Sequence, residues 1–219
     1  MCGIAGWVGS SPERPDVPEK ILQALKHRGP DAQGIRQWRD ATLLHARLSI
    51  LDLSPTGAQP MANEDDSIWV VLNGEIYNYE ELRGDLIKKG HKFRGRSDTE
   101  VITHLYEEYG TSFLAHLRGM FALGLWDVQK KQMIIARDRF GIKPLFFAYT
   151  GNRLAFASEI RALLCMPDLD RRPNHQAISD YAALFYIPAP LTFYTGISSL
   201  QPCEALIAEW DADKIRWHT

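Results

Sequence analysis

The chain has 219 residues, of which 45% are hydrophobic and 24% charged, so it can form a folded core without disulfide or metal support. Its 25 basic and 27 acidic residues give a net charge of -2, which offers no electrostatic case for a nucleic-acid or anionic-membrane partner. The three cysteines, Cys2, Cys165 and Cys203, are too few for a disulfide scaffold. Because the first residues also lack the pattern of a signal peptide, we expect a cytoplasmic protein.

Short apolar runs bounded by turn residues predict most of the strands. They lie at residues 4–8, 42–51, 67–72, 120–126, 132–136, 144–149 and 153–157. The polar residues 127–131 and 150–152 separate the last two pairs of runs, so we expect two hairpins. The Asn73–Gly74 pair that follows residues 67–72 is also typical of a tight turn, and we expect that strand to end there.

Four helices are expected among these strands. Three begin with a pattern resembling a capping box, in which two side chains bind the free N–H groups of the first turn; the pairs are Asp16 with Glu19, Asn78 with Glu81, and Ser97 with Glu100. These helices should end near Gly29, Gly90 and Gly110, and a fourth should start near Glu159. Strands joined by hairpins instead of β-α-β crossovers predict an α+β fold with antiparallel sheets.

The composition changes after Asp168, where proline becomes frequent and the periodic patterns weaken. Residues 181–203 carry no formal charge, but their prolines exclude an unbroken membrane-spanning helix. We interpret this stretch as a buried strand-and-loop segment and expect no membrane partner. The sequence thus divides into a domain at residues 1–168 and a C-terminal extension at residues 169–219.

Several common reaction chemistries find no support in the sequence. It has no GxxxxGK[ST], GxGxxG or GxSxG segment, which disfavours phosphate-binding loops and serine nucleophiles at a strand-helix elbow. The seven histidines show no HExxH pattern and no close spacing to cysteine. We therefore expect no metal site and no histidine-dependent catalytic triad.

Cys2 offers a nucleophile that needs no histidine. If Met1 is removed, Cys2 has both a thiol and a free α-amine, and α-amines have ordinary pKa values of about 7.7–8.0, suited to a general base near neutral pH. A retained Met1 would leave this amine absent. The alternative interpretation is that Cys2 is a small apolar residue that enters the first strand.

Five further positions carry groups suited to acyl transfer, and all but Glu75 also have a structural alternative. The side-chain amide of Asn73 and the backbone N–H of Gly74 are suitable oxyanion donors, unless the pair only forms a turn. Arg47 can bind a carboxylate through two parallel hydrogen bonds, or it is a surface residue. Glu75 and Asp98 can hold an ammonium group, although an acidic residue such as Asp98 is also favoured at a helix N-terminus.

Eight segments, taken in order, resemble the glutaminase domain of glutamine-dependent asparagine synthetases, which belong to the class II (N-terminal nucleophile) amidotransferases. The segments are MCGIAG at 1–6, HRGPDAQG at 27–34, ARLSILD at 46–52, LNGEIYNY at 72–79, RSDTEVI at 96–102, RGMFAL at 118–123, RDRFGIKPL at 137–145 and FASEIRAL at 156–163. They span most of the chain. The resemblance implies a four-layer αββα sandwich of two antiparallel sheets.

The resemblance also implies a role for each candidate residue. Cys2 would attack glutamine with its own amine as the base, Asn73 and Gly74 would form the oxyanion hole, and water would hydrolyse the resulting thioester to glutamate. The substrate contacts would be Arg47 for the α-carboxylate, Glu75 and Asp98 for the α-ammonium, and main-chain groups of Leu48, Ser49, Ile50 and Leu51.

The implied partners are L-glutamine and a synthetase domain in the same polypeptide. The glutaminase domain would need no cofactor and no metal, whereas the synthetase domain would use ATP and Mg²⁺ to make asparagine from aspartate. The chain contains no SGGxDS-type pyrophosphate loop, so we expect it to be an N-terminal part whose residues 171–210 lead toward that domain. Whether it forms a homodimer is left open.

Two alternative functions remain. In the first, the domain is a class II amidotransferase that supplies ammonia to another amide acceptor, in polysaccharide or secondary metabolism. In the second, it is a catalytically silent module of the same fold.

Overall fold

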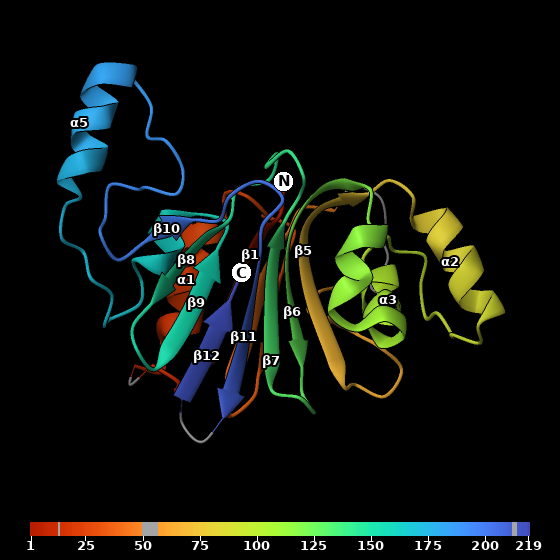
Figure 1. Ribbon diagram of the computed structural model, residues 1–219. Coiled ribbons are helices and arrows are strands. Elements are labelled where there is room, and N and C mark those ends of the chain that lie inside the picture. The colour runs from red at the N-terminus through yellow and green to blue at the C-terminus, as the bar shows by residue number, and fades with distance from the viewer. Residues whose placement is uncertain (13, 50–56, 212–213) are drawn as a thin grey trace.

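The computed structural model describes residues 1–12, 14–49, 57–211 and 214–219. Its strands form two sheets in which every neighbouring pair is antiparallel (Figure 1). In spatial order the first sheet consists of β10 (Ser198–Ser199), β8 (Phe146–Tyr149), β9 (Arg153–Ala157), β1 (Gly3–Gly9), β3 (Ala41–Arg47) and β2 (Ala32–Gln37). The second consists of β12 (Lys214–His218), β11 (Ala205–Asp211), β7 (Gln132–Arg137), β6 (Gly119–Asp127), β5 (Ile68–Ile76) and β4 (Met61–Ala62).

Helices cover the outer faces of the two sheets. The first sheet packs against α1 (Val17–Leu25) and α4 (Ile160–Leu163), and the second against α2 (Tyr79–Lys88), α3 (Glu100–Tyr109) and the short 3-10 helix η2 (Gly110–His116). A third apolar cluster, which includes Ile4 of β1 and Trp126 of β6, fills the space between the sheets. The layer order helix, sheet, sheet, helix confirms the predicted α+β sandwich.

Strand β1 illustrates why these residues form these layers. Its side chains alternate between the two faces of the sheet, so Ile4 and Val8 pack between the sheets while Ala5 and Trp7 contact the helical side. Both faces of the strand are therefore buried, which explains its continuous apolar sequence. The two predicted hairpins, β6–β7 and β8–β9, are likewise confirmed.

The predicted turn at Asn73–Gly74 is wrong, because β5 continues through both residues to Ile76. In the register with β6, Asn73 lies opposite Ala122 and Gly74 opposite Phe121. The glycine is required by close packing, since a Cβ atom at position 74 would lie 2.1 Å from the Met120 carbonyl oxygen. The turn preference of Asn-Gly is local, and the long pairing with β6 overrides it.

The helices lie near the expected positions, but the predicted capping boxes are wrong. At the N-cap positions of α1 and α2, neither Asp16 nor Asn78 makes a side-chain capping hydrogen bond. Asp16 instead pairs with Lys20 and Arg14. Hydrogen bonds from these two side chains lower its pKa. Helix α1 ends at Leu25, several residues before the expected glycine.

Near α3 and η2 the side chains expected to cap helices bind other backbone groups. Asn78 donates to the His116 carbonyl oxygen at 3.0 Å and accepts from the Arg118 N–H at 3.0 Å. Glu100 accepts from the backbone N–H groups of Arg94 and Gly95, at 2.6 and 2.9 Å. These side chains therefore fix loops, and the helix begins without the predicted reciprocal pair.

The C-terminal part also corrects the sequence interpretation. Residues 175–184 form α5 (His175–Leu184), capped by Asn174, whose side chain accepts the Ala177 N–H at 3.2 Å. Helix α5 projects away from the sandwich (Figure 1), and Phe185 and Tyr186 after it are exposed, so the start of residues 181–203 is not buried. Strands β10 and β11 then return to the two sheets. In the described ranges, no helix has both the length and the apolar character needed to cross a membrane.

Candidate active site

The candidate site continues the inner face of both sheets. Every second side chain of a strand faces the same side of the sheet, so these side chains form a row along the strand. A row that begins in the core between the sheets leaves the core where the strand ends. The rows are Ile4 and Cys2 backward along β1, Leu43, His45 and Arg47 along β3, and Val71, Asn73 and Glu75 along β5. Each row changes from apolar to polar at the same end of the sandwich.

These polar side chains line one pocket with a volume of about 90 Å³. All predicted site residues for which the structure has a description border it, namely Cys2, Arg47, Leu48, Ser49, Asn73, Gly74, Glu75 and Asp98. Ile50 and Leu51 lie outside the described residues. The structure therefore brings together positions that are up to 96 residues apart in sequence.

Cys2 is held on two sides. Its sulfur accepts the Leu48 N–H at 3.4 Å and lies 3.6 Å from the Leu48 carbonyl oxygen. Its own carbonyl oxygen accepts a hydrogen bond from Arg28 Nε at 3.0 Å, and Arg28 in turn binds Glu159 at 3.0 Å. The loop after β3 and a partly buried ion pair thus fix the position of the thiol.

Glu159 supports Arg28 as an ionised carboxylate. Although burial opposes its ionisation, hydrogen bonds from Arg28 and His27 hold the pKa of Glu159 below its usual value. The loop on the other side of the sulfur is held by Asp31, which accepts the Ser49 N–H at 2.8 Å. Sequence reasoning assigned no role to Arg28, Asp31 or Glu159, although each lies within one of the eight resembling segments.

Asn73 presents an unusual buried amide. The residue is 1% exposed, and among the described residues neither its side-chain nitrogen nor its oxygen has a hydrogen-bond partner. Buried amides are almost always paired, so an unpaired one that borders a pocket is available to a bound molecule. Gly74 follows it in the same strand and also borders the pocket.

Two carboxylates, Glu75 and Asp98, also border the pocket. Asp98 is 7% exposed and accepts the Ile76 N–H at 2.9 Å. Burial, followed by the nearby charge of Glu75, raises the pKa of Asp98 above its usual value. Gln59, which sequence reasoning missed, supports this side by accepting the Leu72 N–H at 2.6 Å and donating to the Thr99 hydroxyl at 3.1 Å.

His45 is a further pocket residue without a sequence assignment. It is 1% exposed, and burial lowers its pKa from the usual 6.5 to about 4. The imidazole is therefore neutral near pH 7. No signal other than its place in the row of β3 distinguished it from the other histidines.

The comparison with protein families identifies the family of the chain. A family model described as a glutamine amidotransferase domain matches residues 1–219. The chain belongs to the glutamine amidotransferase family.

Relatives of this amidotransferase domain are longer than the chain. It is 36% identical over 214 residues to asparagine synthetase [glutamine-hydrolyzing] 3 of Bacillus subtilis, covering 94% of this chain and 34% of the relative. It is 38% identical over 222 residues to amidase chry2 of Gibberella zeae, covering 94% and 32%. The chain thus spans about a third of the length of these two relatives.

A solved structure supports the fold assignment. The glutamine phosphoribosylpyrophosphate amidotransferase of B. subtilis, complexed with ADP and GMP, aligns with a TM-score of 0.70 at 19% identity over 99% of this chain and 49% of that chain. The family and the fold expected from the sequence are confirmed. The roles of the individual site residues stay predictions.

Proposed function

We propose that this domain hydrolyses L-glutamine to glutamate and ammonia through a thioester on Cys2. The proposal rests above all on the pocket, which combines one thiol, the unpaired amide of Asn73 and opposite charges in a small space. Family membership supports glutamine as the substrate.

In the proposed reaction the free α-amine of Cys2, exposed by removal of Met1, accepts the thiol proton. The thiolate attacks the side-chain amide carbon of glutamine, and Asn73 Nδ2 and the Gly74 N–H donate to the oxyanion. The amine then donates its proton to the leaving ammonia. Water hydrolyses the thioester, which releases glutamate and restores the thiol.

The charges around the pocket would orient the substrate. Arg47 would bind the α-carboxylate through two parallel hydrogen bonds, while Glu75 and Asp98 would bind the α-ammonium. Because the pKa of Asp98 is raised by burial and by Glu75, a bound ammonium group would relieve the repulsion between the two carboxylates. This arrangement selects free glutamine over a glutamine side chain within a protein.

For the full protein we propose that ammonia passes to an ATP- and Mg²⁺-dependent synthetase domain that makes asparagine from aspartate. The names of two asparagine synthetase relatives, of whose length this chain spans 34% and 24%, support this acceptor. A second candidate, transfer to a different acceptor, is favoured by the similarity to amidase chry2. Growth of an asparagine-requiring strain carrying the complete gene would distinguish them. A cytoplasmic location and a homodimer stay predictions.

The nucleophile is tested by a pair of cysteine variants. We expect the purified protein to lack Met1 by mass spectrometry and to release glutamate from glutamine, whereas Cys2→Ala releases none. Cys203→Ser is the matched control, because Cys203 is exposed and does not border the pocket, so its activity should equal that of the wild type. Equal activity in the wild type and in Cys2→Ala would refute the proposal.

A further inference from the structure

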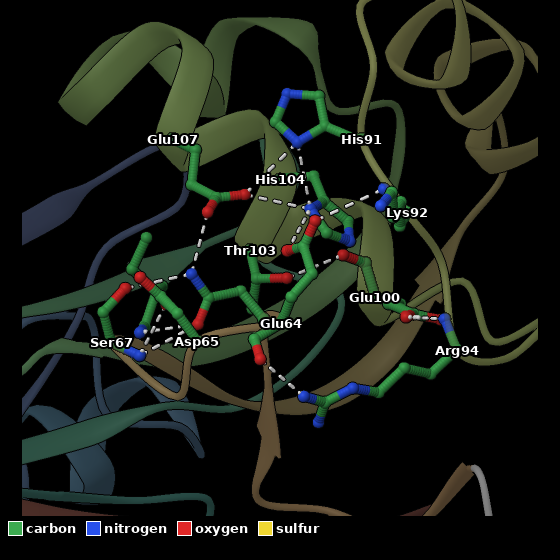
Figure 2. A network of polar contacts seen from close by, with 12 residues as sticks. Glu64, Asp65, Ser67, His91, Lys92, Arg94, Glu100, Thr103, His104 and Glu107 are labelled. Atoms are coloured by element: carbon green, nitrogen blue, oxygen red, sulfur yellow. Dashed lines mark hydrogen bonds and ion pairs between the residues drawn. The ribbon is translucent and has the colours of Figure 1, made fainter.

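A cluster of histidine and carboxylate side chains lies beside α3, outside the catalytic pocket (Figure 2). It joins Glu64 from the turn between β4 and β5, His91 from the segment after α2, and His104 and Glu107 from α3. These three segments are separated in sequence, so residue spacing alone does not reveal the cluster.

The donor atoms of Glu64, His91 and His104 all lie within 4.8 Å of one another, and Glu107 places a carboxylate oxygen next to both imidazoles. The Nδ1 atoms of His91 and His104 are 3.2 Å apart, and Glu107 Oε2 lies 2.9 Å from Nδ1 of His104 and 3.3 Å from Nδ1 of His91. Glu64 Oε2 lies 3.5 Å from the same Nδ1 of His104. Around a tetrahedral zinc ion with bonds of about 2.0–2.1 Å, neighbouring donor atoms are about 3.3 Å apart. These four spacings, from 2.9 to 3.5 Å, lie close to that value.

Three of the four side chains are oriented by outer hydrogen bonds. These bonds join His91 Nε2 to Glu108 Oε1 at 3.0 Å, the Asn63 amide nitrogen to Glu107 Oε1 at 2.8 Å, and the Lys92 N–H to Glu64 Oε1 at 3.3 Å. In each case the other polar atom of the side chain, Nδ1 of His91 or Oε2 of Glu107 and Glu64, faces the centre of the cluster. Metal ligands in proteins are held in this way, with the second atom of each side chain bound by an outer partner.

His104 gives the strongest indication that a cation belongs here. Its side chain is fully buried, and its Nε2 has no partner within the described part of the chain, so its polar contacts all pass through Nδ1. That Nδ1 faces His91 Nδ1 and two carboxylates, and a single N–H donates well to only one of them. A divalent cation in place of the proton would bind all of these groups together.

The local charge also favours a cation. Glu64, Glu107 and Glu108 contribute three carboxylates, and Glu108 is paired with Lys89 at 2.8 Å. The two other carboxylates face the imidazole rings of His91 and His104. Imidazole nitrogen combined with carboxylate oxygen is a donor set that suits zinc among the common divalent ions.

We propose that Glu64, His91, His104 and Glu107 bind one divalent transition-metal ion of the zinc type. The ion would join the β4–β5 turn, the segment after α2 and helix α3, and would take no part in glutamine hydrolysis. The sequence prediction of no metal site depended on spacing within short segments, which this arrangement does not use.

The test uses the 219-residue chain, freed of any histidine tag and of metal, with ZnCl₂ as the probe. We expect one zinc ion per chain to remain after gel filtration in the presence of a weak chelator, measured by elemental mass spectrometry. We also expect a higher melting temperature in the presence of zinc. Co²⁺ should give the intense visible bands of a four-coordinate site without a thiolate charge-transfer band.

Variants locate the ion. His91→Gln and Glu64→Gln should each lose stoichiometric zinc while keeping the circular dichroism spectrum of the metal-free wild type. His175→Gln, on the exposed start of α5, is the matched control and should retain zinc. Cys2→Ala should retain it too, because the catalytic thiol is outside the cluster.

The proposal is overturned by any of three results: no zinc retained by the wild type, zinc retained in both His91→Gln and Glu64→Gln, or zinc lost in Cys2→Ala. The last result would assign the ion to the catalytic thiol. None of these outcomes depends on glutaminase activity, so the metal site and the proposed function are tested separately.

Discussion

At the scale of single residues, the side chain of Asn73 combines deep burial with the absence of any partner in the described structure. Such a side chain adds little to folding, because desolvating an unpaired amide costs free energy that no hydrogen bond offsets. In the proposed mechanism, its position at the pocket lets its amide donate a hydrogen bond to the oxyanion. Function and stability should therefore separate at this residue.

Asn73→Ala should lower kcat by about 10²- to 10³-fold, the usual effect of removing one oxyanion donor, with a smaller change in KM. Its free energy of unfolding should stay within about 1 kcal/mol of the wild type, because no hydrogen bond is lost. Steady-state glutamate release and urea denaturation measure the two effects.

Asn63 provides the matched control for Asn73. It is equally buried, but its side-chain oxygen accepts the N–H groups of Ser67 and Ile68, each at 3.0 Å. Asn63→Ala should thus lose about 1–3 kcal/mol of stability and retain kcat. If Asn73→Ala behaves like Asn63→Ala, the side chain of Asn73 has a structural role instead.

Substitution of Asp98 should also affect activity and stability differently. Burial and the charge of Glu75 raise its pKa, so at pH 7 the ionised carboxylate is less stable in the folded than in the unfolded protein. In Asp98→Asn the amide oxygen can still accept the Ile76 N–H. The free energy of unfolding should therefore be unchanged or higher, while the KM for glutamine rises about 10- to 100-fold through loss of the charged contact.

Asp168→Asn is the control for this variant, because Asp168 binds Arg153 through both oxygens at 2.7 Å and does not border the pocket. It should lower stability without changing KM. A KM for Asp98→Asn equal to that of the wild type would exclude Asp98 from binding the ammonium group.

At the scale of elements, β5 serves both the core and the site. Its first residues and Ile76 pack in the apolar clusters, whereas residues 72–75 border the pocket. Pairing with β6 extends through this end of the strand to Ile76. The pair Asn-Gly, which elsewhere forms turns, lies here within a strand, and Gly74 lets the backbone of β5 pass close to the Met120 carbonyl oxygen of β6.

Gly74→Ala should lower stability by about 1–3 kcal/mol, because the new methyl group would overlap the Met120 carbonyl oxygen. It should also reduce activity by displacing the neighbouring Asn73. Gly84→Ala is the control, since Gly84 lies within α2 with no atom within 4 Å of the added Cβ, and alanine there should stabilise the helix by about 0.5–1 kcal/mol. Denaturation midpoints compare the two variants, and equal stabilities would contradict the packing argument.

At the scale of the whole molecule, the site exists only where the two sheets meet. His45 lies in this contact and is kept neutral by burial, with a pKa of about 4 in the folded state against the usual 6.5. Between these two values the unfolded chain binds a proton that the folded protein does not. Stability should therefore fall as the pH falls from 6.5 toward 4, by roughly 3 kcal/mol in total from this residue.

The prediction is checked with His45→Gln, which cannot take up a proton. Its free energy of unfolding, measured by urea denaturation from pH 7.5 to 4.5, should decrease less steeply than that of the wild type, whatever its value at pH 7.5. His175→Gln, at an exposed position, should keep the wild-type slope. Parallel slopes for the wild type and His45→Gln would mean that the buried imidazole does not control acid stability.

The sequence was sufficient for properties that are encoded locally or by long runs of matching residues. Apolar runs identified β1, β6, β7, β8 and β9, since alternation and burial leave a clear imprint on strands. The eight ordered segments identified the family and named the residues that now border the pocket. Local patterns were misleading where partners distant in sequence compete with them, as at Asn73–Gly74 and at the predicted capping boxes.

Only the tertiary structure decided how these residues are supported and what else the fold brings together. Arg28 contacts Cys2 and Glu159, and Asp31 contacts Ser49. Spacing in the sequence does not predict these contacts, because they join segments far apart in the chain. The same holds for Glu64, His91 and His104, which converge from three separate segments. The physical reason is that the sequence encodes which side chains are apolar and which peptide units pair locally. Distances between polar atoms depend on how two sheets and their helices pack.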